Sequence, residues 1–251
     1  MQLLGVGRTA EVFEFGEDRV VKLDRVEFQG LSEYEASVLH KLAHRNLPLP
    51  REFGTVQIDG RQGVVLERFY GPLLTDVIRD HENLQALADE FVEMHFSLSR
   101  EQIAGIPSLN DRLVAEVSRS GLPGAVIDEL TSSLTRDTSP KGLCHFDLHP
   151  DNVIVSAEGM KIIDWLNVGM GSTHADFART LLLRIGTTDH HIKDFMIHVK
   201  RLGQDRREIA DEELHMWTRV VAAARMSEGF DQQHIAFLRD IALGVNSFHA
   251  E

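Results

Sequence analysis

The stretch 143-LCHFDLHPDNVIV-155 places polar side chains at alternate positions, His145, Asp147 and His149. Alternate residues of an extended chain lie on the same face, so these three side chains would lie together. Two kinds of chemistry fit the spacing. The three residues can bind one metal ion, as in a metallohydrolase. Alternatively, Asp147 alone accepts a proton from a hydroxyl group, and the histidines support the loop.

Asn152 and Asp164 flank a predicted β hairpin, in which the strand-like runs NVIV and MKIID are joined by the turn SAEG. An antiparallel hairpin brings the start of its first strand close to the end of its second. An amide oxygen and a carboxylate would therefore meet at one end of the hairpin, with Asp147 in the preceding loop. Oxygen ligands of this kind suit Mg²⁺, which commonly keeps several waters and substrate phosphates.

A glycine-containing segment, 5-GVGRT-9, joins two predicted strands near the start of the chain. Glycines let backbone N–H groups approach phosphate oxygens. Lys22 then ends a predicted strand, and Glu35 lies one turn into the next predicted helix. A strand lysine that pairs with a helix carboxylate can be held against nucleotide phosphates. Taken singly, each of these features is more typical of a turn or a solvated charge.

The elements that must position these residues fall into two parts. The first part is rich in short strands and holds one helix at residues 31–44, with Ser32 and Glu35 in a capping-box pattern that predicts Ser32 as the N-cap. The segments with strand patterns are 2–23 and 55–69. The sequence predicts domains at residues 1–66 and 73–251, joined by a hinge at 67–72.

The second part has the apolar spacing of helices, interrupted by the predicted hairpin at residues 152–164. The segment 122–136 is one such helix. Beyond Gly171 the predicted helical segments are 174–186, 191–202, 212–226 and 234–245.

Composition narrows the class of protein. The chain has 251 residues, 43% of them hydrophobic and 26% charged, with a formal net charge of −13. An acidic chain of this kind disfavours nucleic acid as a partner. The single cysteine, Cys144, excludes an intramolecular disulfide and a cysteine-rich zinc site. No apolar run reaches the roughly 20 residues of a membrane span, and no signal-peptide pattern is present, so we expect no membrane partner and a cytoplasmic location. Composition carries no signal of oligomeric state.

The ordered motifs together resemble the protein-kinase-like fold. More narrowly, the chain resembles the aminoglycoside phosphotransferase family and its choline-kinase-like relatives, which typically carry His-Gly-Asp-Leu-His-x-x-Asn and then Ile-Asp-Trp. The corresponding text here is 145-HFDLHPDN-152 and 162-IIDW-165, and 174-HADFARTLL-182 resembles the family's next segment. The resemblance implies an α+β bilobal fold. A small antiparallel sheet with one helix forms the N-lobe, and a larger, mainly helical C-lobe holds the catalytic hairpin.

By this resemblance Asp147 is the catalytic base, while Asn152 and Asp164 hold Mg²⁺. Lys22 steadies the α- and β-phosphates and Glu35 orients Lys22. The implied reaction is in-line transfer of the γ-phosphoryl group of ATP or GTP to a hydroxyl of a small molecule. The resemblance also implies nucleotide contacts at Gly5, Gly7, Thr9, Glu67 and Phe69, and structural support of the catalytic loop by His145 and Asp176.

Two departures from the family pattern bear on the substrate. Phe146 stands where the family usually has glycine, so its ring must pack into the helical part or narrow the substrate entrance. The resemblance implies an aminoglycoside-like antibiotic or another amino-hydroxy compound as the acceptor. Asn167 stands where relatives often have an acid, which weakens the case for an aminoglycoside. A metabolic sugar or amino alcohol is the alternative acceptor. A nucleotide-binding relative without activity is a further alternative.

Overall fold

The computed structural model describes residues 1–184 and 187–245, which form two compact units. The first unit comprises Met1–Val77, Ile103–Ile106 and Pro150–Val168, and the second comprises Ile78–Gln102, Pro107–His149 and Gly169–Glu251. These units are interleaved along the chain, unlike the predicted division at residues 67–72. The functional limits of the lobes and the hinge stay a prediction.

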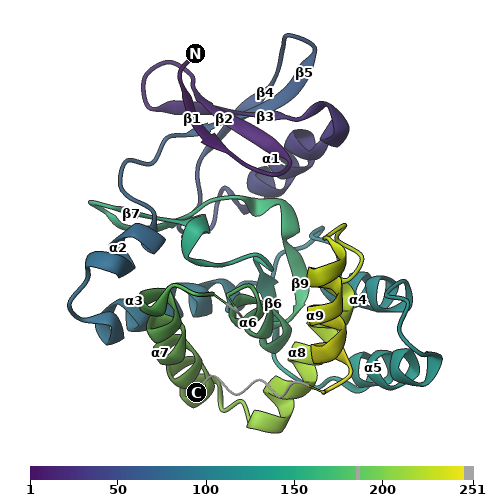
Figure 1. Cartoon of the computed structure of the whole chain (residues 1–251). Helices are drawn as coiled ribbons and strands as arrows, with labels where there is room; N and C mark the ends of the chain where they lie inside the picture. Colours follow the sequence, from purple (N-terminus) through teal and green to yellow (C-terminus); the bar gives the residue numbers. More distant parts are fainter. Residues whose placement is uncertain (185–186, 246–251) are drawn as a thin grey trace. The chain divides into compact units, whose positions relative to one another are not determined.

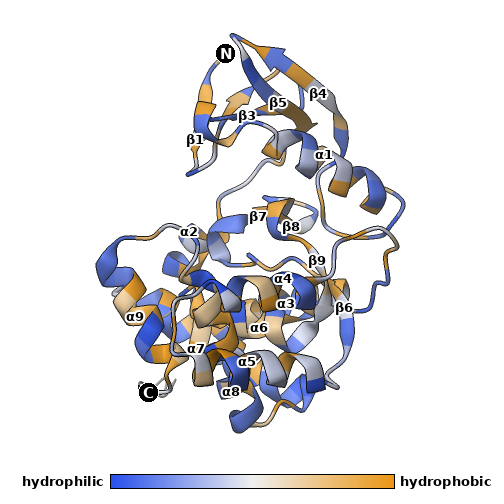
Figure 2. Cartoon of the chain, turned by 90° about the vertical axis from the view of Figure 1, so that its right-hand side faces the viewer, coloured by the Kyte–Doolittle hydropathy of each residue, from blue (hydrophilic) through white to orange (hydrophobic). Residues whose placement is uncertain are grey.

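A five-stranded antiparallel sheet of order β1-β2-β3-β5-β4 is the frame of the first unit (Figure 1). Hydrophobic and hydrophilic residues are mixed along its strands, as Figure 2 shows, and Val21, Leu23 and Val65 form its buried core. Asp59 and Gly60 make the turn between the last two strands with φ of 50° and 78°. The strands are β1 (Leu3–Val6), β2 (Ala10–Glu14), β3 (Arg19–Asp24), β4 (Glu52–Ile58) and β5 (Arg61–Glu67).

The helix α1 (Leu31–Leu42) packs against β4 and β5, after a short 3-10 turn η1 (Val26–Phe28). The prediction of Ser32 as its N-cap is wrong, because the N-cap is Gly30, at φ 100° and without a side-chain cap. The carboxylate of Asp24 accepts hydrogen bonds from the backbone N–H groups of Gly30 and Ser32, at 3.0 and 3.1 Å, and from the Ser32 hydroxyl at 3.0 Å. An acid at the end of β3 therefore caps the helix, and Glu35 serves another purpose.

The predicted hairpin is present as β7 (Val153–Ser156) and β8 (Gly159–Ile162), between the 3-10 turns η2 (Pro150–Asn152) and η3 (Trp165–Asn167). It belongs to the first unit, although the sequence placed it in the helical part. The reason is backbone hydrogen bonding: Ile162 N–H donates to the Pro48 carbonyl at 2.7 Å, and Val155 N–H donates to the Pro72 carbonyl at 2.9 Å.

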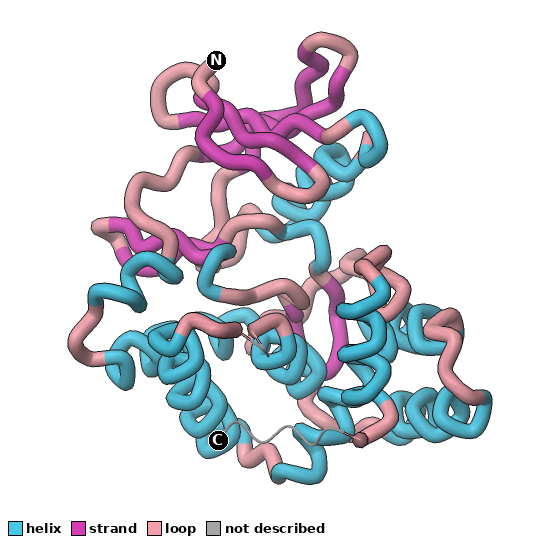
Figure 3. The backbone as a smooth tube through the Cα atoms, in the orientation of Figure 1, coloured by secondary structure: helices cyan, strands magenta, loops and turns pink. Residues whose placement is uncertain are grey.

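Helices make up most of the second unit, in cyan in Figure 3. They include α3 with α7, α6 with α8 and α8 with α9 as packed pairs. A two-stranded antiparallel pair, β6 (Lys141–Cys144) with β9 (Gly169–Ser172), was not predicted. None of the helices within residues 1–184 and 187–245 combines the length and the apolar character of a membrane span. The helices are α2 (Leu74–Asp80), which begins in the first unit, α3 (Leu84–Ser99), α4 (Leu109–Ser118), α5 (Gly124–Arg136), α6 (Thr173–Leu182), α7 (His190–Arg207), α8 (Asp211–Arg225) and α9 (Gln232–Ala242).

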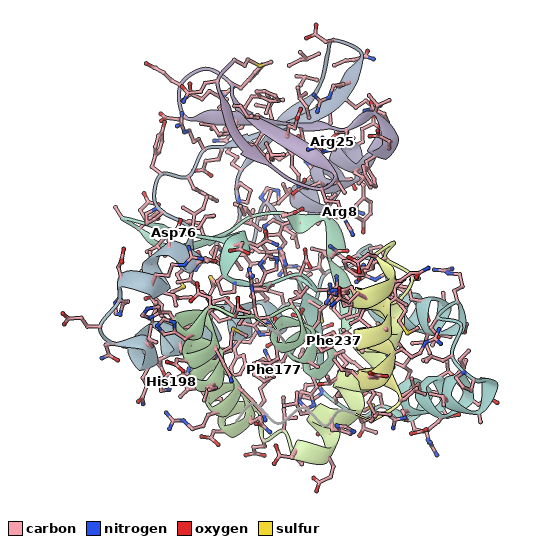
Figure 4. The ribbon with its side chains drawn as sticks, viewed as in Figure 1. Arg8, Arg25, Asp76, Phe177, His198 and Phe237 are labelled. Carbon is pink, nitrogen blue, oxygen red and sulfur yellow. The ribbon has the colours of Figure 1, made fainter. Side chains whose placement is uncertain are left out.

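The helix α6 is buried along all of its length. Phe177, labelled in Figure 4, packs so closely on Gly203 of α7 that a Cβ there would lie 2.1 Å from its ring. The helix ends at Leu182, and residues 185–186 of the predicted segment 174–186 lie outside the described residues. Burial on every side forces the charged residues of α6 to find partners inside the protein.

Candidate active site

A buried lysine between two carboxylates is the main feature of the first unit. Lys22 Nζ lies 2.8 Å from Glu35 Oε2 and 2.8 Å from Asp164 Oδ1. Lys22 comes from the middle strand β3 and Glu35 from α1, which the Asp24 cap joins to the end of that strand. The predicted pair of strand lysine and helix carboxylate is therefore formed, and it includes the predicted metal ligand Asp164.

The charges in this cluster depend on one another. Burial favours the neutral form of Lys22, but the negative charges of Glu35 and Asp164 outweigh it and raise the pKa of Lys22. Burial raises the pKa of Glu35, and the Lys22 charge opposes that shift. The Glu35 side chain is only 1% exposed, so its carboxylate relies on Lys22 and on the Trp165 N–H, which donates to Oε1 at 2.9 Å.

Asp164 and Asn152 lie at the same end of the hairpin, as predicted. The Ile163 N–H donates to the Asn152 carbonyl at 3.0 Å, which extends the ladder between β7 and β8 to this end. Asp164 has φ 64° and ψ 71°, an uncommon left-handed conformation for a residue other than glycine. The buried Trp165 fixes the turn by donating from its indole N–H to the Ile162 carbonyl at 3.0 Å.

This end of the hairpin fits a magnesium ion by the chemistry of its donors. An amide and a carboxylate are hard oxygen ligands, and few protein ligands are needed when phosphates and waters complete the coordination. Within residues 1–184 and 187–245, no group of three or more His, Cys, Asp or Glu side chains is arranged to hold a metal. The neighbouring Asp151 accepts a hydrogen bond from the Thr75 hydroxyl, which ties η2 to α2.

The glycine-containing segment forms a tight connection between β1 and β2. Gly5 lies within β1, and Gly7 N–H donates to the Ala10 carbonyl at 2.8 Å. Arg25 also holds this segment. Its backbone N–H donates to the Thr9 carbonyl at 2.8 Å, and its side-chain Nε donates to the Gly7 carbonyl at 3.1 Å. Figure 4 labels Arg25 and the neighbouring Arg8. Phosphate contact by this segment stays a prediction.

Glu67 and Phe69 lie at the end of β5 and just after it. Glu67 ends β5, where its N–H donates to the Arg51 carbonyl at 2.8 Å and its carboxylate accepts from the Arg51 N–H at 3.0 Å. Phe69 is half-buried, with Lys161 Nζ 5.7 Å from its ring centroid. Purine contact by their backbone groups also stays a prediction.

Asp147 lies in the second unit, in the loop after β6. Its Oδ1 lies 3.3 Å from Nη2 of Arg179, and its side chain is 20% exposed. Burial alone would raise the pKa of Asp147, but the Arg179 charge, helped by His149 and His145, holds that pKa below the usual range. Asp147 is therefore ionised at neutral pH, as a general base must be.

Phe146 and Asp176 show how the loop that carries Asp147 is held. Phe146 is 1% exposed, so its ring packs into the helical part, which is the first of the two predicted outcomes. Its φ is 58°, in the left-handed region where glycine is at ease. The Phe146 N–H donates to Asp176 Oδ1 at 2.8 Å, and His95 Nε2 lies 3.4 Å from Asp176 Oδ2. Burial raises the pKa of Asp176 to about 6.

The two histidines of the loop have different surroundings. His145 is fully buried, and its support of the loop stays a prediction. Arg184 Nη2 lies 2.9 Å from His149 Nδ1, and because a guanidinium can only donate, this ring nitrogen accepts when the imidazole is neutral. Over the described residues, His145, Asp147 and His149 are not arranged as ligands of one ion. The geometry therefore supports the base interpretation of the loop over the metal triad.

Two charged residues in the surroundings of Asp147 were missed by the sequence analysis. Arg179 was read as part of a motif without a role, and Glu228 lies beyond every motif. Arg179 Nη1 lies 2.6 Å from Glu228 Oε1. The available signal was a basic residue in 174-HADFARTLL-182, which also carries Asp176, and such a charge does not identify a partner.

Several solved structures share this fold. A crystal structure of aminoglycoside-3'-phosphotransferase of type VIII superposes with a TM-score of 0.66 and 19% identity, over 89% of this chain and 93% of that chain. A thermostable mutant of aminoglycoside phosphotransferase APH(4)-Ia gives 0.71 and 14%, over 97% and 92%. Amicoumacin kinase hAmiN, in complex with AMP-PNP, Ca²⁺ and Ami, gives 0.61 and 16%, over 97% and 87%. These likenesses establish the fold and confirm the predicted protein-kinase-like class.

Sequence comparison places the chain more directly. No curated protein matches it. The profile of the family described as "Phosphotransferase enzyme family" matches residues 1–211, which is most of the chain. The resemblance inferred from the motifs is thereby confirmed, and the chain belongs to the phosphotransferase enzyme family.

Proposed function

We propose that this protein transfers the γ-phosphoryl group of ATP or GTP to a hydroxyl group of a small molecule. The observation that carries the proposal is Lys22 held 2.8 Å from both Glu35 and Asp164, with Asp164 beside Asn152 at the hairpin end. This cluster suits the binding of a metal-bound nucleotide. Family membership supports the same reaction class.

In the proposed reaction the acceptor hydroxyl oxygen attacks the γ-phosphorus in line. The bond between that phosphorus and the β–γ bridging oxygen breaks, and a nucleoside diphosphate leaves. Asp147 takes the hydroxyl proton as the new bond forms. Lys22 binds nucleotide phosphate oxygens, and Glu35 keeps the ammonium group in place.

Asn152 and Asp164 would hold Mg²⁺, which when bound neutralises charge on the β- and γ-phosphates. With Asp164 as a metal ligand, Lys22 would be able to donate to a phosphate oxygen the N–H that Asp164 accepts in this structure. The glycine-containing segment with Gly5, Gly7 and Thr9 covers the phosphates in this proposal, and the backbone at Glu67 and Phe69 meets the base. His145 and Asp176 support the loop that carries Asp147.

For the acceptor we propose an amino-hydroxy compound of the aminoglycoside type. Two solved structures with this fold are, by their names, aminoglycoside phosphotransferases, and one APH(4)-Ia structure is a ternary complex with AMP-PNP and hygromycin B. A metabolic sugar or amino alcohol is the competing acceptor, because Asn167 replaces an acid that is frequent in relatives. We propose that the reaction takes place in the cytoplasm, where nucleoside triphosphates are available.

A coupled assay of nucleoside diphosphate release, ADP from ATP or GDP from GTP, tests the proposal. The purified protein with Mg-ATP or Mg-GTP is screened against amino sugars, amino alcohols and simple sugars. We expect turnover with at least one class, and Asp147→Asn to lower kcat by about 10²- to 10⁴-fold, the usual contribution of a general base.

Nucleotide binding supplies the control for this experiment. Asp147→Asn should bind Mg-ATP within about threefold of the wild type, because the variant keeps Lys22, Asn152 and Asp164. Unchanged turnover in Asp147→Asn would overturn the assignment of the base. Tight Mg-ATP binding without turnover on the whole panel would favour a nucleotide-binding relative without activity.

A further inference from the structure

Arg179 is a buried guanidinium that joins two carboxylates. It lies on α6 and is 4% exposed. Its Nη1 lies 2.6 Å from Glu228 Oε1, whereas its Nη2 lies 3.3 Å from Asp147 Oδ1. The shorter contact identifies Glu228 as the anchor of the guanidinium. The second nitrogen, Nη2, is then directed at the Asp147 carboxylate.

The ring of Phe146 is a second anchor for the same guanidinium. Arg179 Cζ lies 4.8 Å from the ring centroid, and Arg112 Cζ lies 4.9 Å from the same centroid. Cations within about 6 Å of an aromatic centroid are attracted to its face, and more strongly where water is excluded. The residue next to Asp147 in the chain thus packs on the arginine that binds Asp147.

Glu228 connects this arrangement to the end of α8. Arg225 Nε lies 3.4 Å from Glu228 Oε2, which makes a row of alternating charges, Arg225, Glu228, Arg179 and Asp147. Arg225 and Glu228 lie beyond residue 211, where the match to the family ends. Glu228, which lies outside the family match, therefore anchors the arginine that binds the proposed base.

We propose that Arg179, anchored by Glu228 and packed on Phe146, is a positioning residue that sets the orientation of the Asp147 carboxylate. The inference rests on the proposed function of Asp147 as the general base. A base is effective only when its accepting oxygen faces the reacting hydroxyl within hydrogen-bond distance. Because Glu228 and the Phe146 ring fix the Arg179 guanidinium, it restricts rotation of the Asp147 carboxylate and keeps that carboxylate charged.

Other charged groups act on these two residues. His149 and His145 add to the effect of Arg179 on Asp147. Glu116 of α4 acts on Arg179 together with Glu228 and Asp147, and all three raise the pKa of the arginine against the effect of burial. Burial raises the pKa of Glu116 itself. A test must therefore remove the Arg179 charge and leave these groups in place.

Titration of Asp147 by NMR provides that test. The full chain is labelled with ¹³C at the aspartate carboxyl carbon, and the Asp147 resonance is assigned by its loss in Asp147→Asn. In Arg179→Met we expect the titration midpoint of Asp147 to rise by about 1 pH unit or more. Arg179→Lys should recover part of the shift. The control is Arg219→Met, which removes an arginine paired with Glu129 at 2.6 Å and should leave Asp147 unchanged.

Kinetics then separate positioning from general support of the fold. With an acceptor found in the panel, Arg179→Met should lower kcat at least tenfold and change the KM for ATP less than threefold, with the acid limb of the pH profile moved upward. A midpoint for Asp147 no higher in Arg179→Met than in Arg219→Met would overturn the proposal. If Arg179→Met does not fold, the wild-type titration decides: a midpoint below about 3.9 supports the proposal and one above it overturns it. The titration needs neither nucleotide nor acceptor, so failure of the proposed function would show separately, as absence of turnover.

Discussion

Each unit of the protein buries one cation between two carboxylates, but the two clusters differ in symmetry. Lys22 lies 2.8 Å from both Glu35 and Asp164. Arg179 lies 2.6 Å from Glu228 and 3.3 Å from Asp147. In the lysine cluster the deeper acid is 1% exposed, whereas in the arginine cluster the acids are 22% and 20% exposed.

The difference suits the two proposed tasks. A lysine is a compact charge that can exchange one oxygen partner for another, as a group that meets phosphates must. An arginine is a planar fork, so a partner at one tip fixes what the other tip can reach. The lysine cluster is thus suited to receiving a ligand, and the arginine cluster is suited to holding a protein group still.

Removal of the lysine should have the largest effect on stability. Lys22→Met leaves the Glu35 carboxylate buried without its cation, and breaking such a pair costs about 3–5 kcal/mol of unfolding free energy. Urea unfolding measures the loss. The double variant Lys22→Met/Glu35→Gln should regain part of it. Arg179→Met should lose less, because Glu228 keeps Arg225 and is partly exposed; equal losses would contradict the comparison.

The next effect is a pH dependence of stability in the second unit, which holds the arginine cluster. Because the pKa of Asp176 is about 6 when folded and 3.8 ordinarily, the folded state binds this proton more strongly. The unfolding free energy therefore falls as the pH rises from about 4 to about 6, by about 3 kcal/mol, and levels off above that.

Asp176→Asn should remove this contribution and keep an acceptor for the Phe146 N–H. The measurement is urea unfolding of both proteins across this pH range. A difference between wild type and Asp176→Asn that does not change with pH would contradict the raised pKa.

The smallest of the three effects on stability concerns Phe146, whose ring packs against Arg179. Phe146→Gly loses a buried aromatic ring but relieves a residue at φ 58°, so we expect a net loss of about 2 kcal/mol. Phe146→Ala is the matched control, since it loses the ring and keeps the backbone cost. It should be less stable than Phe146→Gly by about 1 kcal/mol in the same urea assay. The reverse order would show that the left-handed backbone carries no cost here.

The lysine cluster could be predicted from the sequence because its members sit in recognisable local patterns. A strand lysine, a helix acid and the hairpin end each have a signature, and an antiparallel hairpin brings Asn152 and Asp164 to one end whatever its side chains. The cap of α1 was mistaken because the capping acid, Asp24, lies eight positions before Ser32, outside the four residues that a capping box spans.

The arginine cluster could not be predicted because its contacts depend on packing between distant segments. Arg179 meets Asp147 across 32 positions and Glu228 across 49. No local spacing rule applies at such separations. The short strands β6 and β9 were missed for the same reason, since Lys141–Cys144 becomes a strand only through its pairing with Gly169–Ser172. The contact of Asp176 with the Phe146 N–H also joins distant segments, but here the family resemblance had already implied Asp176 as support of the loop.

The cap that Asp24 provides has a consequence for the entropy of the fold. Asp24 and Ser32 are only eight positions apart, so their hydrogen bonds close a short loop, and the cost of closing a loop rises with its length. That closure joins the strand that carries Lys22 to the helix that carries Glu35. Much of the chain freedom that would oppose the ion pair is therefore already lost when the helix is capped, and the pair forms between groups that are nearly in place.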